Sequence, residues 1–326
     1  MKGNKKLLIF SILCIVAGLV LTAFSGVRDG GYLKQLLGEA GNARLQEKKT
    51  VDVTEAFHSL SVTESSADVQ LLPSEDGGCR VVYGEDEYSR CSVSVENGVL
   101  TVARETKDHA RSGLIVFEET LPVCIYLPVE SYRALSVTAS SGDFRSSGSF
   151  SWETAAIETH SGDIRLEELS AETLTVKSGS GDIKLRGCGV GSLTLESSSG
   201  ELKAEALSCS GDGQLRSGSG DIELEESSFR SLAISATSGE VRLTKIVCSG
   251  SVKAETTSGD ITLRKASAES YELRSASGDV KGSVLGSVDF IVETSSGGVH
   301  TKGGQRGAAP CRVNTLSGDV DLETDR

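Results

Sequence analysis

Apolar and polar residues alternate in short runs through the C-terminal part of the chain, and the alternation returns every 19 to 21 residues. In each repeat, apolar residues stand two and four positions after a glycine, as Ile183 and Leu185 do after Gly181. A second pair stands seven and five positions before it, as Leu174 and Val176 do. Because period two turns one face of a strand inward, each repeat predicts two strands joined by a turn. The ten turn glycines are Gly142, Gly162, Gly181, Gly200, Gly220, Gly239, Gly259, Gly278, Gly297 and Gly318.

The regular period predicts the architecture. A unit this short cannot bury its apolar face until a neighbour covers it, so each unit is expected to be one coil of a stack. The chain has four prolines and no sustained helical apolar period after its N-terminus, which favours strands. We predict an all-β fold, a parallel β-helix-like solenoid of about ten coils of 19–21 residues. Apolar residues seven positions after the glycine are expected to point inward at the far corner: Leu169, Leu207, Ile246 and Leu285.

Residues 1–26 predict a membrane anchor or a signal segment. Three lysines precede an apolar run from Leu7 to Phe24, which is just long enough to span a bilayer. Positive charge before such a run predicts a cytoplasmic N-terminus, a single pass through the cell membrane and an extracytoplasmic C-terminal part. The alternative is a signal peptide, because small residues stand where a peptidase could cut before Gly26, and the protein would then be secreted.

Between this segment and the repeats lie two further parts. Residues 27–50 are expected to form a stalk or linker, and residues 51–134 an N-terminal β cap, before the solenoid repeats of residues 135–326. The cap contains a first degenerate coil, in which Ala67 stands at the glycine position. Asn97-Gly98, between two strand-like runs, predicts a hairpin.

An acid follows the turn glycine in nine of the ten repeats. Stacked carboxylates repel each other unless they are compensated or bind cations, so the row is a candidate calcium ladder. Its aspartates are Asp143, Asp163, Asp182, Asp221, Asp260, Asp279 and Asp319.

Two neighbouring rows favour a structural turn instead. A basic residue such as Arg165 stands two positions after the acid in six repeats, and the row four positions before the glycine largely alternates in sign. Opposite charges on adjacent strands stabilise each other modestly. The outer walls are then expected to neutralise themselves, with the glycine supplying a positive φ at the turn.

Composition narrows the possible partners. The net charge of −13 disfavours nucleic acid. Eight cysteines without metal-ligand spacing and four scattered histidines give no metal site, no cofactor and no catalytic residue. Most cysteines are expected to be buried small hydrophobes, and Cys79 and Cys91 are the candidates for a disulfide. Phe150 and Trp152 either form an exposed platform for sugars or cover the end of the core.

Several motifs, in order, carry a resemblance to a known family. They are Asp68-Val69 leading to Leu72-Pro73-Ser74-Glu75-Asp76, Glu96-Asn97-Gly98 with Leu100-Thr101-Val102, Ile125-Tyr126-Leu127-Pro128, and then the Ser-Gly-Asp repeats. Over about residues 51 to 326 the chain resembles the bacterial putative-adhesin family with a domain of unknown function and β-strand repeats. The resemblance implies a cell-envelope β-solenoid without an established activity.

These observations predict a non-catalytic, adhesin-like extracytoplasmic surface or scaffold protein that binds a cell-envelope protein or surface polymer through the solenoid. The alternative is an envelope-stress sensor or regulatory subunit that contacts a membrane protein. A third possibility is a polysaccharide-acting β-helix enzyme. A catalytic pair needs two acids in different environments, whereas the acids here repeat uniformly, which disfavours the enzyme.

Overall fold

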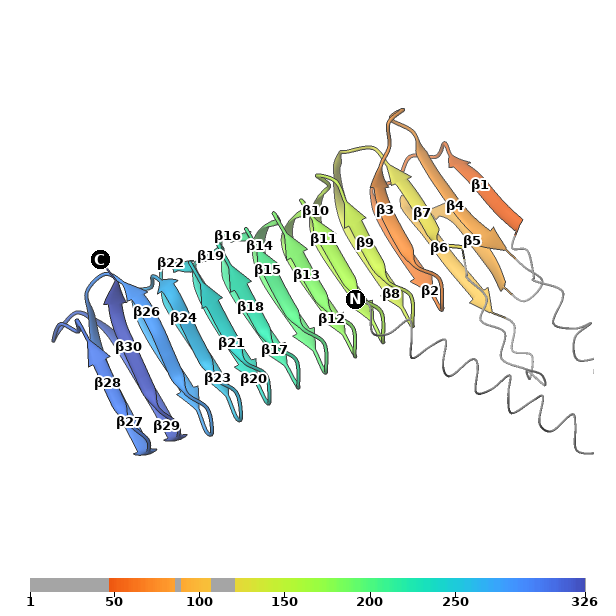
Figure 1. Cartoon of the computed structure of the whole chain (residues 1–326). Coiled ribbons are helices and arrows are strands. Elements are labelled where there is room, and N and C mark those ends of the chain that lie inside the picture. Colours follow the sequence, from red (N-terminus) through yellow and green to blue (C-terminus); the bar gives the residue numbers. More distant parts are fainter. Residues whose placement is uncertain (1–46, 86–88, 107–120, 326) are drawn as a thin grey trace, which may run out of the picture. The chain divides into compact units, whose positions relative to one another are not determined.

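The computed structural model describes residues 47–85, 89–106 and 121–325. These residues form strands in two facing sheets and contain no helix (Figure 1). In this described part there is also no helix long and apolar enough to cross a membrane. The predicted anchor, Leu7 to Phe24, and most of the predicted stalk lie outside the described residues.

The first sheet, sheet A, has fourteen strands. In spatial order they are β1 (Glu47–Val53), β4 (Cys79–Glu85), β7 (Val123–Leu127), β3 (Val69–Pro73), β9 (Phe144–Ser147), β11 (Ile164–Glu167), β13 (Ile183–Arg186), β15 (Leu202–Glu205), β18 (Ile222–Glu225), β21 (Val241–Thr244), β24 (Ile261–Ala266), β26 (Val280–Leu285), β30 (Val320–Asp325) and β28 (Val299–Lys302).

The second sheet, sheet B, has sixteen strands, three of which are short pieces at the far corner of the coils. In spatial order the main strands are β27 (Val288–Ser296), β29 (Ala309–Ser317), β25 (Ser270–Ser275), β23 (Ser251–Thr256), β20 (Ser231–Ala236), β17 (Asp212–Ser217), β14 (Gly189–Ser197), β12 (Ser170–Ser178), β10 (Ser151–Thr159), β8 (Ser131–Ala139), β2 (Ser59–Glu64), β6 (Val99–Thr106) and β5 (Ser89–Glu96). The short pieces are β16 (Ser208–Cys209), β19 (Ser228–Phe229) and β22 (Val247–Cys248).

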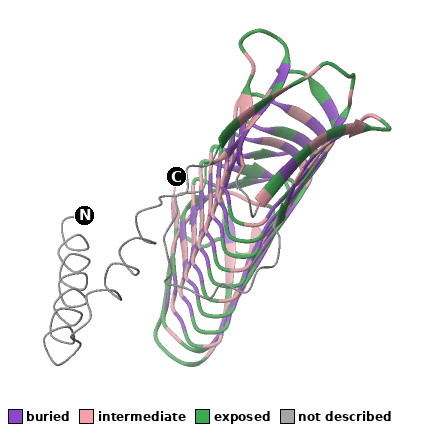
Figure 2. Cartoon of the chain, turned by 90° about the vertical axis from the view of Figure 1, so that its right-hand side faces the viewer, coloured by how far each residue is buried: buried purple, intermediate pink, exposed green. Residues whose placement is uncertain are grey.

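Each coil consists of one strand of sheet B, the Ser-Gly turn and one strand of sheet A. Strands pair in parallel with the same strands of the next coil, so that Leu174 lies beside Leu193, and Ile164 beside Ile183. Identical positions therefore stack, and the inward apolar columns are buried in continuous stripes (Figure 2). The predicted all-β solenoid of about ten coils is confirmed.

The order of the coils in space departs from chain order at both ends. At the N-terminal end, the degenerate coil of β2 and β3 pairs directly with β8 and β9, as predicted, while β6 and β7 form a further coil outside it. At the C-terminal end, β29 and β30 insert between the coil of β25 and β26 and the coil of β27 and β28. The last coil in the chain is thus the second to last in space (Figure 1).

Antiparallel strands complete the N-terminal end. β5 pairs with β6 through the predicted Asn97-Gly98 hairpin, whose two residues have positive φ, and β4 and β1 extend sheet A beyond β7. A buried ion pair fixes this region: the Arg104 Nε lies 2.8 Å from the Glu64 Oε2. The other oxygen of Glu64 accepts the N–H groups of the turn that leads to Ala67. Removing one partner would leave a buried charge uncompensated, which makes the pair a strong structural constraint.

The turn glycines serve a different purpose from the one expected. Positive φ is absent at all of them except Gly297. Instead, a Cβ atom at any of the ten would lie 1.9–2.2 Å from the carbonyl oxygen of the corresponding residue in an adjacent coil. Glycine is required because the backbones of stacked turns touch, not because the turn is left-handed.

The left-handed residues lie at the other corner, six positions after the glycine. There φ is between 51° and 57° at five residues that are not glycine, and positive at two glycines. Their positions are Gly148, Glu168, Gly187, Ala206, Glu226, Lys245 and Lys265. Left-handed backbone costs a residue with a Cβ about 1–2 kcal/mol, so this corner carries strain in most coils.

The inward corner position was predicted correctly for three residues out of four. Leu169, Leu207 and Ile246 are buried, whereas Leu285 is 37% exposed. The register between β24 and β26 shifts after Leu263, so that Val284 pairs with Ala266 and fills the inward position. The shift turns Leu285 outward, and the prediction for this residue was wrong.

Glycine substitutions at the two corners are expected to have opposite effects. Gly181→Ala should lower the free energy of unfolding by about 1–3 kcal/mol, because the new Cβ would overlap the Gly162 carbonyl oxygen. Ala206→Gly should raise it by about 0.5–1 kcal/mol, since glycine relieves the left-handed strain at the cost of a more flexible unfolded chain. Ala204→Gly, the same exchange at a buried strand position, is the control and should destabilise. Thermal and urea unfolding of the three variants measures this. Equal effects of the two Ala→Gly exchanges would contradict the argument.

Candidate functional site

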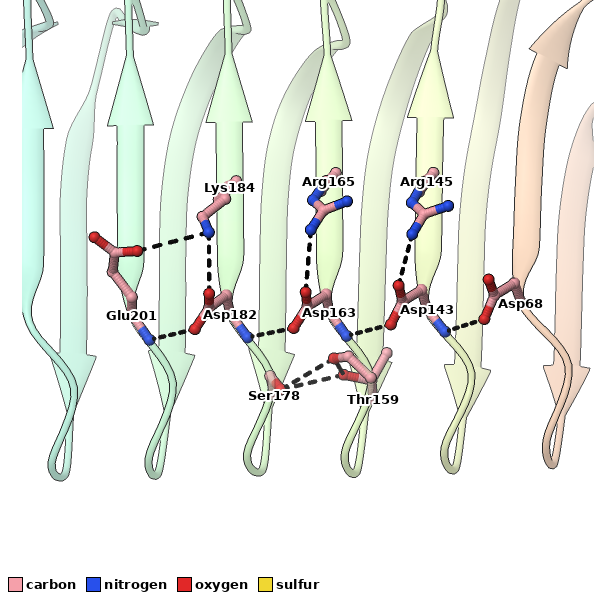
Figure 3. A network of polar contacts seen from close by, with 11 residues as sticks. Asp68, Asp143, Arg145, Thr159, Asp163, Arg165, Ser178, Asp182, Lys184 and Glu201 are labelled. Atoms are coloured by element: carbon pink, nitrogen blue, oxygen red, sulfur yellow. Dashed lines mark hydrogen bonds and ion pairs between the residues drawn. The ribbon is translucent and has the colours of Figure 1, made fainter. Parts of the chain in front are cut away.

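The aspartate row forms a ladder of side chain to backbone hydrogen bonds along the turns (Figure 3). The Oδ1 atom of Asp163 accepts the N–H of Asp182 at 3.0 Å, and the Oδ1 of Asp182 accepts the N–H of Glu201 at 3.0 Å. Every such bond joins one coil to its neighbour. The remaining pairs are Asp68 to Asp143, Asp143 to Asp163, Asp221 to Glu240, Asp260 to Asp279, Asp279 to Asp319, and Asp319 to Gly298.

The ladder is interrupted where glutamate replaces aspartate. Among the described residues, no such bond runs from Glu201 to Asp221 or from Glu240 to Asp260. The longer side chain reaches outward instead, and the Glu240 carboxylate lies 2.6 Å from Arg242. The side chain length of aspartate is therefore what sets the bond to the next turn.

The second oxygen of most ladder carboxylates contacts the predicted basic neighbour (Figure 3). Ion pairs of 2.8–3.2 Å join the Oδ2 atoms to the base two positions later, and list as Asp143 with Arg145, Asp163 with Arg165, Asp182 with Lys184, and Asp279 with Lys281. These carboxylates thus have protein partners on both oxygens. Because the pairs are half-exposed, each contributes little to stability by itself.

The hydrogen bonds lower the pKa of the ladder carboxylates. At Asp279, the N–H of Asp319 and the ammonium of Lys281 hold the pKa of the carboxyl group below its ordinary value. At Asp182, burial pushes the pKa upward, but hydrogen bonds from Lys184 and the Glu201 N–H outweigh it and the net shift is downward.

A column of buried hydroxyl groups lies behind the ladder, three positions before the glycine, and was missed by the sequence analysis. The Oγ of Ser178 accepts the N–H of Gly181 at 2.8 Å, and Thr159 donates to the Gly162 carbonyl at 2.7 Å. The signal was present, since Ser or Thr fills this position in most repeats. The equivalent bonds link Ser197 to Gly200, Ser217 to Gly220, Thr256 to Gly259, and Ser275 to Gly278.

The outer face of sheet B carries a groove of about 780 Å³ that crosses six coils. One side is the alternating charge row, in which Glu196 contacts both Lys177 at 2.8 Å and Arg216 at 3.2 Å. The other side and floor are small or hydroxyl-bearing. The outer rows lining it are Thr138, Glu158, Lys177, Glu196, Arg216 and Ser235, and Ser140, His160, Gly179, Ser198, Gly218 and Thr237.

The predicted charge row is interrupted near the C-terminal end. Because β29 inserts between β25 and β27, Asn314 separates Arg274 from Glu293. Arg274 contacts Glu255 at 2.9 Å, and the amide of Asn314 donates to Glu293 at 3.3 Å. The alternation predicted from the sequence holds only up to Arg274.

The aromatic candidates are not a surface platform. Phe150 and Trp152 are buried, and Trp152 stacks on Tyr132 with ring centroids 4.8 Å apart. Tyr132 stacks in turn on Phe57. The alternative reading, that these residues cover core, is correct, and an aromatic sugar site at Phe150 and Trp152 is not formed.

The described cysteines are free, and all except Cys124 are buried. Cys79 and Cys91 lie on β4 and β5 and are not joined. Burial raises the pKa of the thiols of Cys79, Cys91, Cys248 and Cys311 to about 12, so they remain protonated and unreactive at neutral pH. The described residues contain no group of three or more His, Cys, Asp or Glu that could hold a metal ion.

Whether the ladder binds calcium is a question for melting experiments. We expect millimolar calcium to leave the melting temperature of the full-length protein unchanged relative to magnesium at equal ionic strength, because the ladder oxygens already have donors. A rise specific to calcium, removed by chelator and absent in Asp163→Asn, would show that the ladder is a calcium site.

The lowered pKa values predict the pH dependence of stability. A carboxyl group whose pKa is depressed by folding stabilises the protein above its unfolded pKa of about 3.9, and loses that contribution as the pH falls toward the folded value. The melting temperature should therefore fall steeply below about pH 4. Asp279→Asn should lessen this dependence, as measured by melting at a series of pH values. A melting temperature that rises on acidification would contradict the assignment.

Comparisons with solved structures agree on the fold. A putative adhesin from Parabacteroides distasonis is 12% identical, with a TM-score of 0.51 over 85% of this chain and 97% of that one. A putative adhesin from Bacteroides fragilis is 14% identical, with a TM-score of 0.43 over 86% and 98% of the two chains. A putative lipid binding protein from Parabacteroides distasonis is 13% identical, with a TM-score of 0.40 over 86% and 97%.

No curated protein matches the chain at a significant level. The family described as Toastrack DUF4097 matches residues 57–323, which include the degenerate first coil, all of the Ser-Gly turns and the terminal coils. This match covers most of the sequence and confirms the family resemblance. The chain belongs to the Toastrack DUF4097 family.

Proposed function

We propose that this protein is a non-catalytic, adhesin-like surface protein that binds an elongated envelope or surface polymer along the outer face of sheet B. The observation that carries the proposal is the groove of about 780 Å³ across six coils. At a strand spacing of ~4.8 Å, six coils present a binding surface about 24 Å long. A chain molecule that runs along the stack would meet the same chemical groups at every coil.

The lining of the groove indicates which polymer would fit. Hydroxyl groups of Ser140, Ser198 and Thr237 and the imidazole of His160 offer hydrogen bonds, and the charge row offers both signs. No aromatic residue lines the groove. Recognition would therefore depend on hydrogen bonds and charge, which suits a hydroxyl-rich polymer such as a wall glycan better than an apolar ligand.

A surface location is part of the proposal. It is supported by the lysine-flanked apolar run from Leu7 to Phe24, which favours export of everything that follows. The names of the solved relatives, two of which are putative adhesins, point the same way. Protease treatment of intact cells should degrade the repeats, and protection until the membrane is opened would refute this location.

Absence of catalysis follows from the repetition of the site. The ladder acids share the same two kinds of partner from coil to coil, a backbone N–H and a base. A glycosidase pair requires two carboxyl groups with different environments and different pKa values. The acids of the ladder do not differ in this way.

Crosslinking in the native host tests the binding face. We expect full-length protein with a photo-crosslinker at Thr175, beside the groove, to capture envelope polymer, and Ser198→Phe to reduce the yield at least about tenfold by filling the groove. Ser228→Phe, an exposed serine at the far corner, is the matched control and should bind normally. Capture of one specific membrane protein, unaffected by Ser198→Phe, would favour the sensor or regulatory subunit and contradict the polymer.

A further inference from the structure

The two ends of the stack are finished differently. At the N-terminal end, β5 closes sheet B, and β4 with β1 closes sheet A, all in antiparallel pairing. At the C-terminal end, within the described residues, β27 pairs only with β29, and β28 pairs only with β30. The terminal coil of β27 and β28 therefore presents two open strand edges with unpaired backbone groups, a template for pairing with another chain.

The core is also open at this coil. Val299 is 45% exposed, whereas Val320, in the same column one coil further in, is 1% exposed. Thr301 is exposed beside the fully buried Leu322, and Phe290 is partly buried beside Cys311. Solenoid ends normally need a polar covering, because the apolar columns otherwise meet water.

Exposed apolar side chains gather at the same end. Of the seven large hydrophobic residues exposed in the described part of the chain, four lie on the last three coils: Leu285, Ile291, Val299 and Leu316. An apolar cluster at an unpaired edge marks an interaction surface.

The two open strands carry opposite charges on their outward rows. β27 presents Asp289 and Glu293 on either side of Ile291, and β28 presents His300 and Lys302. Lys302 is largely exposed, and its contact with Glu323 is a distant 3.6 Å. This asymmetry decides which partner the edge accepts.

We propose that the coil of β27 and β28 docks on the same coil of a second copy of this chain, tail to tail. A two-fold axis along the strands exchanges the two sheets, so β27 of each copy lies beside β28 of the other. The two strands of a coil run in opposite directions (Figure 3), and both new pairs are therefore antiparallel. Asp289 and Glu293 then face His300 and Lys302 across each pair, and both sheets and the core continue through the interface.

Charge excludes the other two-fold arrangement. An axis perpendicular to the strands would place β27 against β27, and Asp289 and Glu293 would face their own copies. Like charges on directly opposite strands are destabilising. Head-to-tail growth is also excluded, since the N-terminal end offers antiparallel strands and no matching open coil.

The dimer rests on the geometry of this end alone and stands whether or not the groove binds a polymer. With the N-terminus at the membrane, as proposed above, the C-terminal end is the part that could meet a protein on a facing surface. Under that condition the contact would be homophilic adhesion, in which each copy is the partner of the other.

Sedimentation equilibrium of the full-length protein in mild detergent tests the proposal. We expect a monomer–dimer equilibrium visible at about 100 µM, since an interface below ~1,200 Å² is weak. Asp289→Lys/Glu293→Lys and His300→Glu/Lys302→Glu should each weaken the dimer about tenfold, because each places like charges across both pairs. An equimolar mixture of the two variants should associate again, because one edge is now basic and the other acidic.

The mixture also shows that the variants are folded, since unfolded chains would not recover association. Arg264→Glu/Lys265→Glu, a similar change of charge in the body of the stack, is the matched control and should dimerise normally. A protein that stays monomeric at about 100 µM, a dimer insensitive to both charge reversals, or species that grow beyond the dimer would each overturn the proposal. Loss of polymer capture by Ser198→Phe with an intact dimer would leave the two proposals separately decided.

Discussion

Contact between stacked turns is the constraint on which the rest of the structure depends. Each Ser-Gly turn lies so close to the next that only glycine fits, and the aspartate behind it ties the two coils together through a backbone N–H. This contact fixes the register, because a coil that slipped by one residue would place a Cβ against a carbonyl oxygen. Once the register is fixed, identical positions stack and apolar columns form without further specification.

Much of the fold could be predicted from the sequence because register and repeat are the same information. Positions such as Ile183 and Leu185 alternate with polar neighbours, and their period gives both strands of each coil. The reason for the glycines could not be predicted, since turns that need positive φ and turns that need close approach both select glycine. Likewise, nothing in the sequence marks Ala206 or Lys245 as left-handed; the tertiary stack imposes that conformation on them.

The candidate site was predicted in part for the same reason. The partners of Asp143 and Asp163 follow from spacing, because a base two positions later on a strand shares the outward face. The groove could not be predicted, because it requires Gly179, Ser198 and Gly218 from three separate coils to lie side by side. The coil order at the ends was also out of reach. Sequence order suggested that the coil of Gly318 follows that of Gly297, yet the chain places it inside, where Cys311 and Val313 are sealed on both sides.

Repetition and its interruption give the two surfaces different uses. Along the walls, each coil repeats its neighbour, so a partner that repeats at a similar spacing gains a contact from every coil, and affinity accumulates from weak units. At the C-terminal end repetition stops, and the only surface that continues the pattern is another copy of the same coil. Because β27 is acidic and β28 basic, that continuation is specified by charge as well as by shape. A solenoid with one closed end and one open, charge-matched end is thereby limited to pairs and does not grow into a fibre.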